Sequence, residues 1–164
     1  MKVLVTGANG FIAGYLVQEL LEHDYGIDAE AWSVTSYQQL YREGLDVARW
    51  NRLHPTKKPR RAYATRCFER GEDDLVVAAS DYVKAVPYSI RSWIRGNFVG
   101  LGTDGFGRSE SRSTLRDYFE VDARHIAYAV VEALVREGKI GAKQLERAMK
   151  AWEIDPGKAH PSDG

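Results

Sequence analysis

The chain has 164 residues, 44% of them apolar and 28% charged, which suits one soluble domain with its own core and is too short for two ordinary domains. Lysine plus arginine and aspartate plus glutamate both number 23, so the overall charge gives no basic field to attract nucleic acid or an anionic membrane. A single cysteine excludes an internal disulfide, and the longest apolar run is shorter than a membrane span, so we expect a cytoplasmic protein.

The first part of the chain predicts two strands around one helix. Residues 2–6 (KVLVT) form a short, β-branched apolar run, which is typical of a strand buried on both faces. A glycine-containing turn at 7–14 leads into a helix whose apolar residues recur at three- and four-residue spacing, and Gly26 is well placed to cap its carboxyl end. A second strand is predicted at 29–34.

The next segment predicts helices and then an exposed basic loop. Ser36 and Gln39 have the spacing of a capping box and begin a helix, which we expect Gly44 to end before a second short helix at 45–53. The string HPTKKPRR at 54–61 holds two prolines and four basic residues. Proline forbids a regular element here, so a solvated loop is expected, with a site for phosphate or an acidic partner as the alternative.

Two further strands are predicted beyond this loop. LVVAA at 75–79 is the clearest buried strand; a helix at 62–70 precedes it, and one at 82–94, interrupted at Pro87, follows it. Residues 97–101 form the fourth strand. Short apolar strands separated by helices imply right-handed crossovers, so we predict a three-layer, doubly wound α/β fold with a mainly parallel sheet.

The carboxyl-terminal part is predicted to be helical. Apolar residues recur at helical spacing in 122–136, which Gly138 ends, and again in 142–152. Residues 155–164 are rich in proline, glycine and charge, and we expect them to form a flexible tail. Residues 1–154 are therefore expected to be a single α/β domain.

The loop before these helices is the most informative segment. LGTDGFGRSESRSTLRDYFEVD at 101–122 places three glycines within six residues, which indicates unusual backbone torsion angles or close approach. The loop follows a strand, and functional contacts of open α/β sheets gather at the carboxyl ends of strands. Its polar candidates are Asp104, Arg108, Ser109 and Arg112; the alternative is that the aspartate and serines only bond the loop's own amides.

An ordered series of strings across residues 16–160 resembles the C-terminal, transketolase-like domain of the homodimeric pyruvate dehydrogenase component. The strings are YGIDAEAWSVTSY at 25–37, RWNRLHP at 49–55, AASDYVKAVP at 78–87, the loop at 101–122 and EGKI at 137–140. The HPTKKPRR loop departs from this family, being more basic than its usual acidic and proline-containing sequence.

The resemblance implies a transketolase C-terminal-like fold without chemistry of its own. In that family thiamine diphosphate and Mg²⁺ bind between two other domains, where pyruvate is decarboxylated and the acetyl unit passes to lipoyl groups. The metal motif there is Gly-Asp-Gly followed by paired asparagines, whereas this chain has Thr103-Asp104-Gly105 without such a pair, and its four histidines lack metal-binding spacing. We expect no catalytic, cofactor or metal site in this chain, and no activity from it alone.

The resemblance also implies the partners of the chain. They are the remaining domains of the same enzyme, its dimer mate and the lipoyl acyltransferase core, with no nucleic acid or membrane among them. The loop would contact the catalytic neighbours through Asp104, Phe106, Arg108, Ser109 and Arg112. The chain would thereby complete the homodimer and support the thiamine site from outside.

The first residues carry a second, competing resemblance. KVLVTGANGFIAG, through Gly7, Asn9, Gly10 and Gly14, resembles the opening of nucleotide-sugar epimerases and other extended short-chain dehydrogenases, which implies a small NAD(P)-binding module. However, the third glycine is displaced by one position, no acidic residue ends the second strand, and no tyrosine is followed by lysine at the fourth place. Residues 1–14 thus stand apart from the rest, as a natural variant, a mis-joined reading frame or a graft.

Overall fold

The sheet is the centre of the molecule, and all four of its strands run parallel. The computed structural model describes residues 2–6, 11–68 and 74–163. The strand order is β2-β1-β3-β4, and Val5 of β1 pairs with Ala31 on one side and Val77 on the other. The strands are β1 (Lys2–Thr6), β2 (Asp28–Trp32), β3 (Leu75–Ala79) and β4 (Asn97–Leu101). The predicted parallel sheet is confirmed, with β2 ending at 32 rather than 34.

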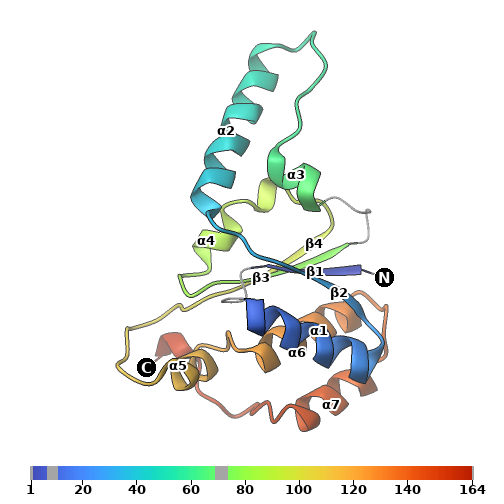
Figure 1. Ribbon diagram of the computed structural model, residues 1–164, viewed down its shortest axis with the longest axis vertical. Coiled ribbons are helices and arrows are strands. Elements are labelled where there is room, and N and C mark those ends of the chain that lie inside the picture. Colours follow the sequence, from blue (N-terminus) through green and yellow to red (C-terminus); the bar gives the residue numbers. More distant parts are fainter. Residues whose placement is uncertain (1, 7–10, 69–73, 164) are drawn as a thin grey trace.

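Helices cover both faces of the sheet, which confirms the three-layer fold (Figure 1). On one side lie α1 (Phe11–Tyr25), α5 (Arg112–Tyr118), α6 (Ala123–Arg136) and α7 (Ala142–Ala151). On the other lie α2 (Tyr37–Leu53), α3 (Tyr63–Phe68), α4 (Ala85–Tyr88) and a 3₁₀ turn at Arg91–Trp93. The crossover from β1 to β2 steps one way along the sheet, and those from β2 to β3 and from β3 to β4 step the other way, so right-handed connections place α1 on one face and α2, α3 and α4 on the other.

Two apolar clusters fill the spaces between these layers. Val77 and Leu134 are fully buried in the larger cluster, between the sheet and the layer of α1 and α6. Val76 points the other way and packs with Phe68 and Ile90 in the smaller cluster under α3 and α4. Successive residues of β3 thus face opposite layers, as the period of a strand requires, and all five are buried as the sequence predicts.

Three helix ends form as predicted. The Ser36 side chain accepts a hydrogen bond from the Gln39 amide at 3.2 Å and so begins α2. Gly26 follows α1 with a positive φ of 62°, and its amide donates to the carbonyl of Glu22 at 2.9 Å. Gly138 has a φ of 71° and follows α6, with its amide donating to the carbonyl of Val135 at 2.9 Å.

Gly44 does not end a helix, so the prediction of two short helices at 36–53 is wrong. The helix α2 runs unbroken from Tyr37 to Leu53, and Gly44 is buried within it. A Cβ atom at this position would lie 2.5 Å from the indole ring of Trp93. The missing side chain lets the 3₁₀ turn pack against α2. The predicted helix at 82–94 is also shorter, because only α4 and this turn are helical.

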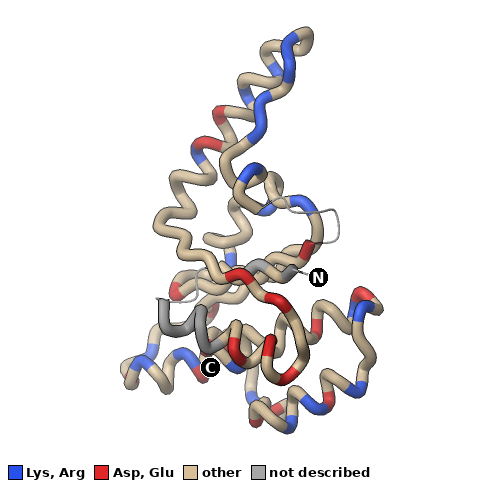
Figure 2. Tube along the Cα trace, turned by 45° about the vertical axis from the view of Figure 1, so that its right-hand side comes forward, with Lys and Arg blue, Asp and Glu red and all other residues tan. Residues whose placement is uncertain are grey.

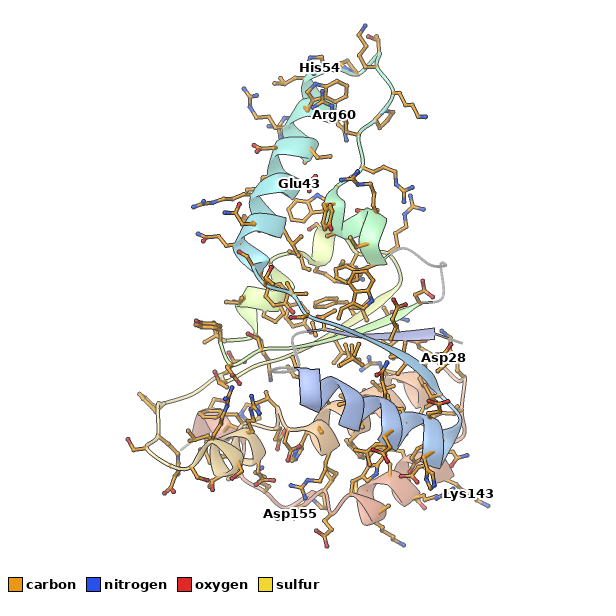
Figure 3. The ribbon with its side chains drawn as sticks, viewed as in Figure 1. Asp28, Glu43, His54, Arg60, Lys143 and Asp155 are labelled. Atoms are coloured by element: carbon orange, nitrogen blue, oxygen red, sulfur yellow. The ribbon has the colours of Figure 1, made fainter. Side chains whose placement is uncertain are left out.

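The far end of α2 and the basic loop after it project from the sheet as an arm (Figure 1). Figure 2 shows lysines and arginines at its tip, and residues 54–61 are all exposed, as predicted. The loop folds back on the helix: the Asn51 amide group donates to the Arg60 carbonyl at 2.9 Å and accepts from the Arg60 amide at 2.7 Å. The Arg60 guanidinium and the His54 ring both lie against the Trp50 ring, in the region labelled in Figure 3.

Residues 155–163, for which the sequence predicts flexibility, lie against α5. The carbonyl of the buried Pro161 accepts a hydrogen bond from the Tyr118 hydroxyl at 3.2 Å. The Lys158 ammonium donates to the carbonyl of Asp117 and lies 3.5 Å from its carboxylate. None of the described helices has the length and apolarity that crossing a membrane requires.

Candidate functional site at the carboxyl edge of the sheet

The carboxyl ends of the parallel strands share one edge, and the loops after β2, β3 and β4 meet there. A cavity of about 690 Å³ lies between the β2–α2 and β3–α4 loops, lined by residues 34–38, 79–82 and Val86. It lies at the carboxyl edge of the sheet, where ligands of open α/β sheets bind. Beside it the buried hydroxyls of Thr6 and Tyr37 are hydrogen-bonded at 3.0 Å, and burial raises the pKa of Tyr37 more than the Thr6 bond lowers it.

The loop at 102–111 is tied at its base to the segment after β3. The Thr103 amide donates to the Tyr82 carbonyl at 2.9 Å, and its hydroxyl donates to the Asp81 carbonyl at 2.9 Å. The Asp104 carboxylate accepts the Lys84 amide at 3.0 Å and lies 3.8 Å from the Lys84 ammonium. Asp104 therefore joins two loops and does not bond only amides of its own loop, whereas Ser111 accepts the Thr114 amide within the segment 101–122; the interface role of these residues stays a prediction.

The glycines of this loop serve two different purposes. Gly105 has a φ of 125°, a backbone angle that residues with a side chain rarely adopt, and a Cβ there would lie 2.5 Å from the Pro161 carbonyl oxygen. Gly102 lies so close to the chain at 82–84 that a Cβ would be 2.5 Å from the Tyr82 carbonyl oxygen. The predicted close approach is confirmed at both, whereas a Cβ on Gly107 would meet nothing within 4 Å.

The other predicted loop residues take separate positions. The Phe106 side chain is 76% exposed, and Ser109 is also exposed. The Arg108 guanidinium lies 4.2 Å above the ring of Tyr118. Arg112 reaches back over the loop, with its Nη2 3.8 Å from the carboxylate of Asp81. The structure thus brings Asp104 and Arg112 to the same neighbouring segment and leaves Phe106 facing outward.

A cleft of about 300 Å³ opens between this loop and α5, and we call it the arginine cleft. Arg108, Arg112 and Arg116 line it together with Asp81. Arg116 was not foreseen, because its approach to Asp81 joins the middle of a helix to a loop 35 positions earlier in the sequence.

A second charged cluster, also missed by the sequence reading, joins α5 to α6. Asp122 is the N-cap of α6 and accepts hydrogen bonds from the His125 amide at 2.9 Å and the His125 ring at 2.7 Å. Arg124 donates to Asp122 at 3.0 Å and to Asp117 at 2.7 Å. Burial alone would raise the pKa of Asp122, but the hydrogen bonds and charge of His125, together with Arg124, lower it to about 2.

This cluster does not favour a metal ion. Asp117, Asp122 and His125 each offer a ligand atom within 4.8 Å of the others. The positive charge that the carboxylates need is already supplied by Arg124 and by Lys158, which lies 3.5 Å from Asp117. We interpret the cluster as a structural link between the end of α5, the start of α6 and the tail.

The Thr103-Asp104-Gly105 string does not fit Mg²⁺ either. A Mg²⁺ ligand must present oxygen atoms to the cation in a regular octahedral arrangement. The Asp104 carboxylate is instead occupied by an amide and an ammonium group of Lys84. We derive no cofactor chemistry from this residue.

The competing dinucleotide motif is only partly covered by the structure. Gly7, Asn9 and Gly10 lie outside the described residues, and Gly14 lies in α1. Strand β1 does lead to α1 and then to the parallel β2, as in nucleotide-binding folds. The segment that ends β2 and follows it reads Trp32-Ser33, so no carboxylate stands where a ribose would be held. The NAD(P) site stays a prediction.

Comparisons with known proteins agree on one family. A family model described as "Transketolase-like TK C-terminal domain" matches residues 4–122. The chain is 45% identical over 146 residues to the pyruvate dehydrogenase E1 component of Pseudomonas aeruginosa, covering 88% of this chain and 16% of that protein. The figures are 40% over 144 residues for Escherichia coli K12, and 42% over 162 residues for Buchnera aphidicola from Acyrthosiphon pisum, there covering 98% of this chain. The chain thus spans less than a fifth of the length of these relatives.

Proposed function

The chain belongs to the transketolase-like TK C-terminal domain family, and from this we propose that it serves as the C-terminal interface domain of a pyruvate dehydrogenase E1 component. In this proposal the thiamine diphosphate, the Mg²⁺ and the catalytic residues belong to other domains. The chain's task is to complete the homodimer and to support the catalytic domains from outside, so that the whole enzyme decarboxylates pyruvate and transfers acetyl groups to a lipoyl acyltransferase.

The distribution of exposed apolar side chains carries this proposal. Among the described residues, Phe106, Tyr82, Val83 and Tyr88 are 76%, 71%, 47% and 44% exposed, and all four lie on the two loops and short helix at the carboxyl edge. The remaining large apolar side chains of this exposed group are on α2 and α3. The described part of the α1, α6 and α7 layer contributes none. Half of these exposed apolar side chains thus lie at the carboxyl edge, and neighbouring exposed apolar side chains are typical of a surface that packs against another protein domain.

The loop is also built to hold its exposed aromatic residue in place. Hydrogen bonds of Thr103 and Asp104 anchor it to the β3–α4 segment shortly before Phe106, and the backbone of Gly105 lies close to the Pro161 carbonyl. A loop whose backbone is already held in place loses less conformational entropy on binding, and aromatic residues are enriched at protein interfaces.

A complementation experiment tests the proposal. The P. aeruginosa E1 component would be prepared without the segment that aligns with this chain, and the chain would be titrated into it calorimetrically. We expect one-to-one binding that Phe106→Ala weakens by about thirtyfold, the effect of removing an interface hot spot. Leu53→Ala, which truncates a 54% exposed leucine on the arm, is the control. A loss with Leu53→Ala and none with Phe106→Ala would place the interface elsewhere and refute the role of the loop.

Two further measurements separate this proposal from its alternatives. The isolated chain mixed with thiamine diphosphate, Mg²⁺ and pyruvate should release no carbon dioxide; release would show a catalytic site within it. Titration with NAD and NADP tests the alternative function, that of a small NAD(P)-binding module using Gly7, Asn9, Gly10 and Gly14. Micromolar binding of either nucleotide would favour that module.

A further inference from the structure

We propose that the arginine cleft binds a small organic anion, a carboxylate or phosphate group carried on an apolar body. This inference concerns the chain by itself and does not rest on the proposed interface role. The cleft lies outside the carboxyl ends of β3 and β4, between the 102–111 loop and α5. Ligands of open α/β sheets bind outside this edge.

The charges of the cleft are unbalanced. Three arginines, Arg108, Arg112 and Arg116, are among the residues that line it, against one acidic residue, Asp81. The Asp81 carboxylate lies 3.8 Å from the Nη2 atoms of both Arg112 and Arg116, too far for a hydrogen bond to either. One acidic group is thus shared between two arginines at long range, and the cleft keeps an excess of positive charge.

Arg116 is the arginine of the cleft whose hydrogen-bond donors are least used within the described chain. Its side chain is 21% exposed, and its Nε and Nη2 atoms are buried without a hydrogen-bond partner among the described residues. Buried donors without acceptors are destabilising, and they are rare in folded proteins. Nε and Nη2 form one edge of the guanidinium fork, and a rotation of the side chain that turns this buried edge into the cleft would let two oxygens of a carboxylate or phosphate meet it together.

The apolar residues of the lining indicate which kind of group carries the anion. Leu115, Phe119 and Val121 contribute an apolar wall beside the arginines. The volume of about 300 Å³ is at the lower limit of ligand pockets, so it suits one ring or a short branched chain and not a dinucleotide. An anion with an apolar body satisfies both parts of the lining, whereas a bare inorganic ion satisfies only the arginines.

Calorimetric titration of the chain with four probes tests this site. We expect phenyl phosphate or phenylacetate to bind one-to-one and at least about tenfold more tightly than neutral benzyl alcohol, because the charged hydrogen bonds are lost with the alcohol. The tighter of the two anions identifies the preferred group. Inorganic phosphate should also bind about tenfold more weakly, since it leaves the apolar wall uncovered. Equal affinity for benzyl alcohol and the anions, or no binding of either anion at millimolar concentration, would overturn the proposal.

Variants then locate the site. Arg116→Gln should weaken binding of the better anion by about tenfold or more, while Arg136→Gln, on the exposed part of α6, should leave it unchanged. Asp81→Asn removes the competing carboxylate and should tighten binding several-fold, which tests the cleft even where Arg116→Gln fails to fold. Unchanged affinity in Asp81→Asn, or an equal effect of Arg116→Gln and Arg136→Gln, would show that the anion binds elsewhere.

Discussion

Replacing Asp122 by asparagine should destabilise the domain at neutral pH and remove part of its sensitivity to acid. Asp122 begins α6, and its side chain is only 19% exposed. Asparagine is an equally good N-cap, so the hydrogen bond from the His125 amide can persist in the variant. What the variant loses is the negative charge that faces His125 and Arg124.

The size of the effect follows from the pKa of the carboxyl group. Burial raises that pKa, but the hydrogen bonds and charges of His125 and Arg124 bring it from an ordinary 3.8 down to about 2. At roughly 1.4 kcal/mol for each pH unit, the ionised form contributes about 2 kcal/mol to folding. Because the folded pKa is lowered, this stability is fully present above pH 4 to 5 and is lost as the pH falls toward 2.

Urea unfolding of both proteins at pH 7, 5, 4 and 3 provides the assay. We expect Asp122→Asn to be about 2 kcal/mol less stable at pH 7, with about half of that difference gone at pH 3. Ser36→Ala, which removes the uncharged N-cap of α2, is the control and should cost about 1 kcal/mol at every pH. A difference for Asp122→Asn that stays constant from pH 7 to 3, or no difference at pH 7, would refute the reasoning.

Two other substitutions test the packing. Gly44→Ala should lower stability by about 1–3 kcal/mol in thermal unfolding, because the clash of the new methyl group with the Trp93 ring outweighs the gain of about 1 kcal/mol in helix propensity. Gly107→Ala is the control and should be nearly neutral, since a Cβ there meets nothing within 4 Å; equal effects of the two substitutions would contradict the close approach of Trp93. Tyr37→Phe should cost about 1 kcal/mol in urea unfolding by leaving the buried Thr6 hydroxyl without its partner, and unchanged stability would show that this bond contributes nothing.

Local signals in the sequence were sufficient for most of the fold. The LVVAA run of β3, the Ser36 cap and the glycine after α1 act through residues no more than a few places apart, so each is legible in the sequence. Gly44 was misread for the opposite reason. A glycine in a helical pattern usually indicates a helix end, but Gly44 lies within α2 and leaves room for the ring of Trp93, which is nearly fifty residues away in the sequence.

The candidate site was predicted only in part. The sequence predicted that the loop at 101–122 has an unusual backbone and that Asp104 and Arg112 are candidate site residues. Their partners, Lys84 and Asp81, precede them by twenty or more residues, so these contacts could not be predicted from local patterns. Arg116 carries no signal in a sequence read alone, because an arginine in an amphipathic helix is normally a solvated charge.

Periodicity, caps and characteristic strings are local properties of the chain, and they were enough to predict the family and the parallel α/β fold and to point to the loop after β4. Which charges meet depends on the three-dimensional fold. A parallel sheet brings the loops that follow its strands to one edge, however far apart they lie in sequence. That edge joins Asp104 to Lys84 and leaves the guanidinium of Arg116 without a hydrogen-bond partner for its buried Nε and Nη2 atoms in the described chain.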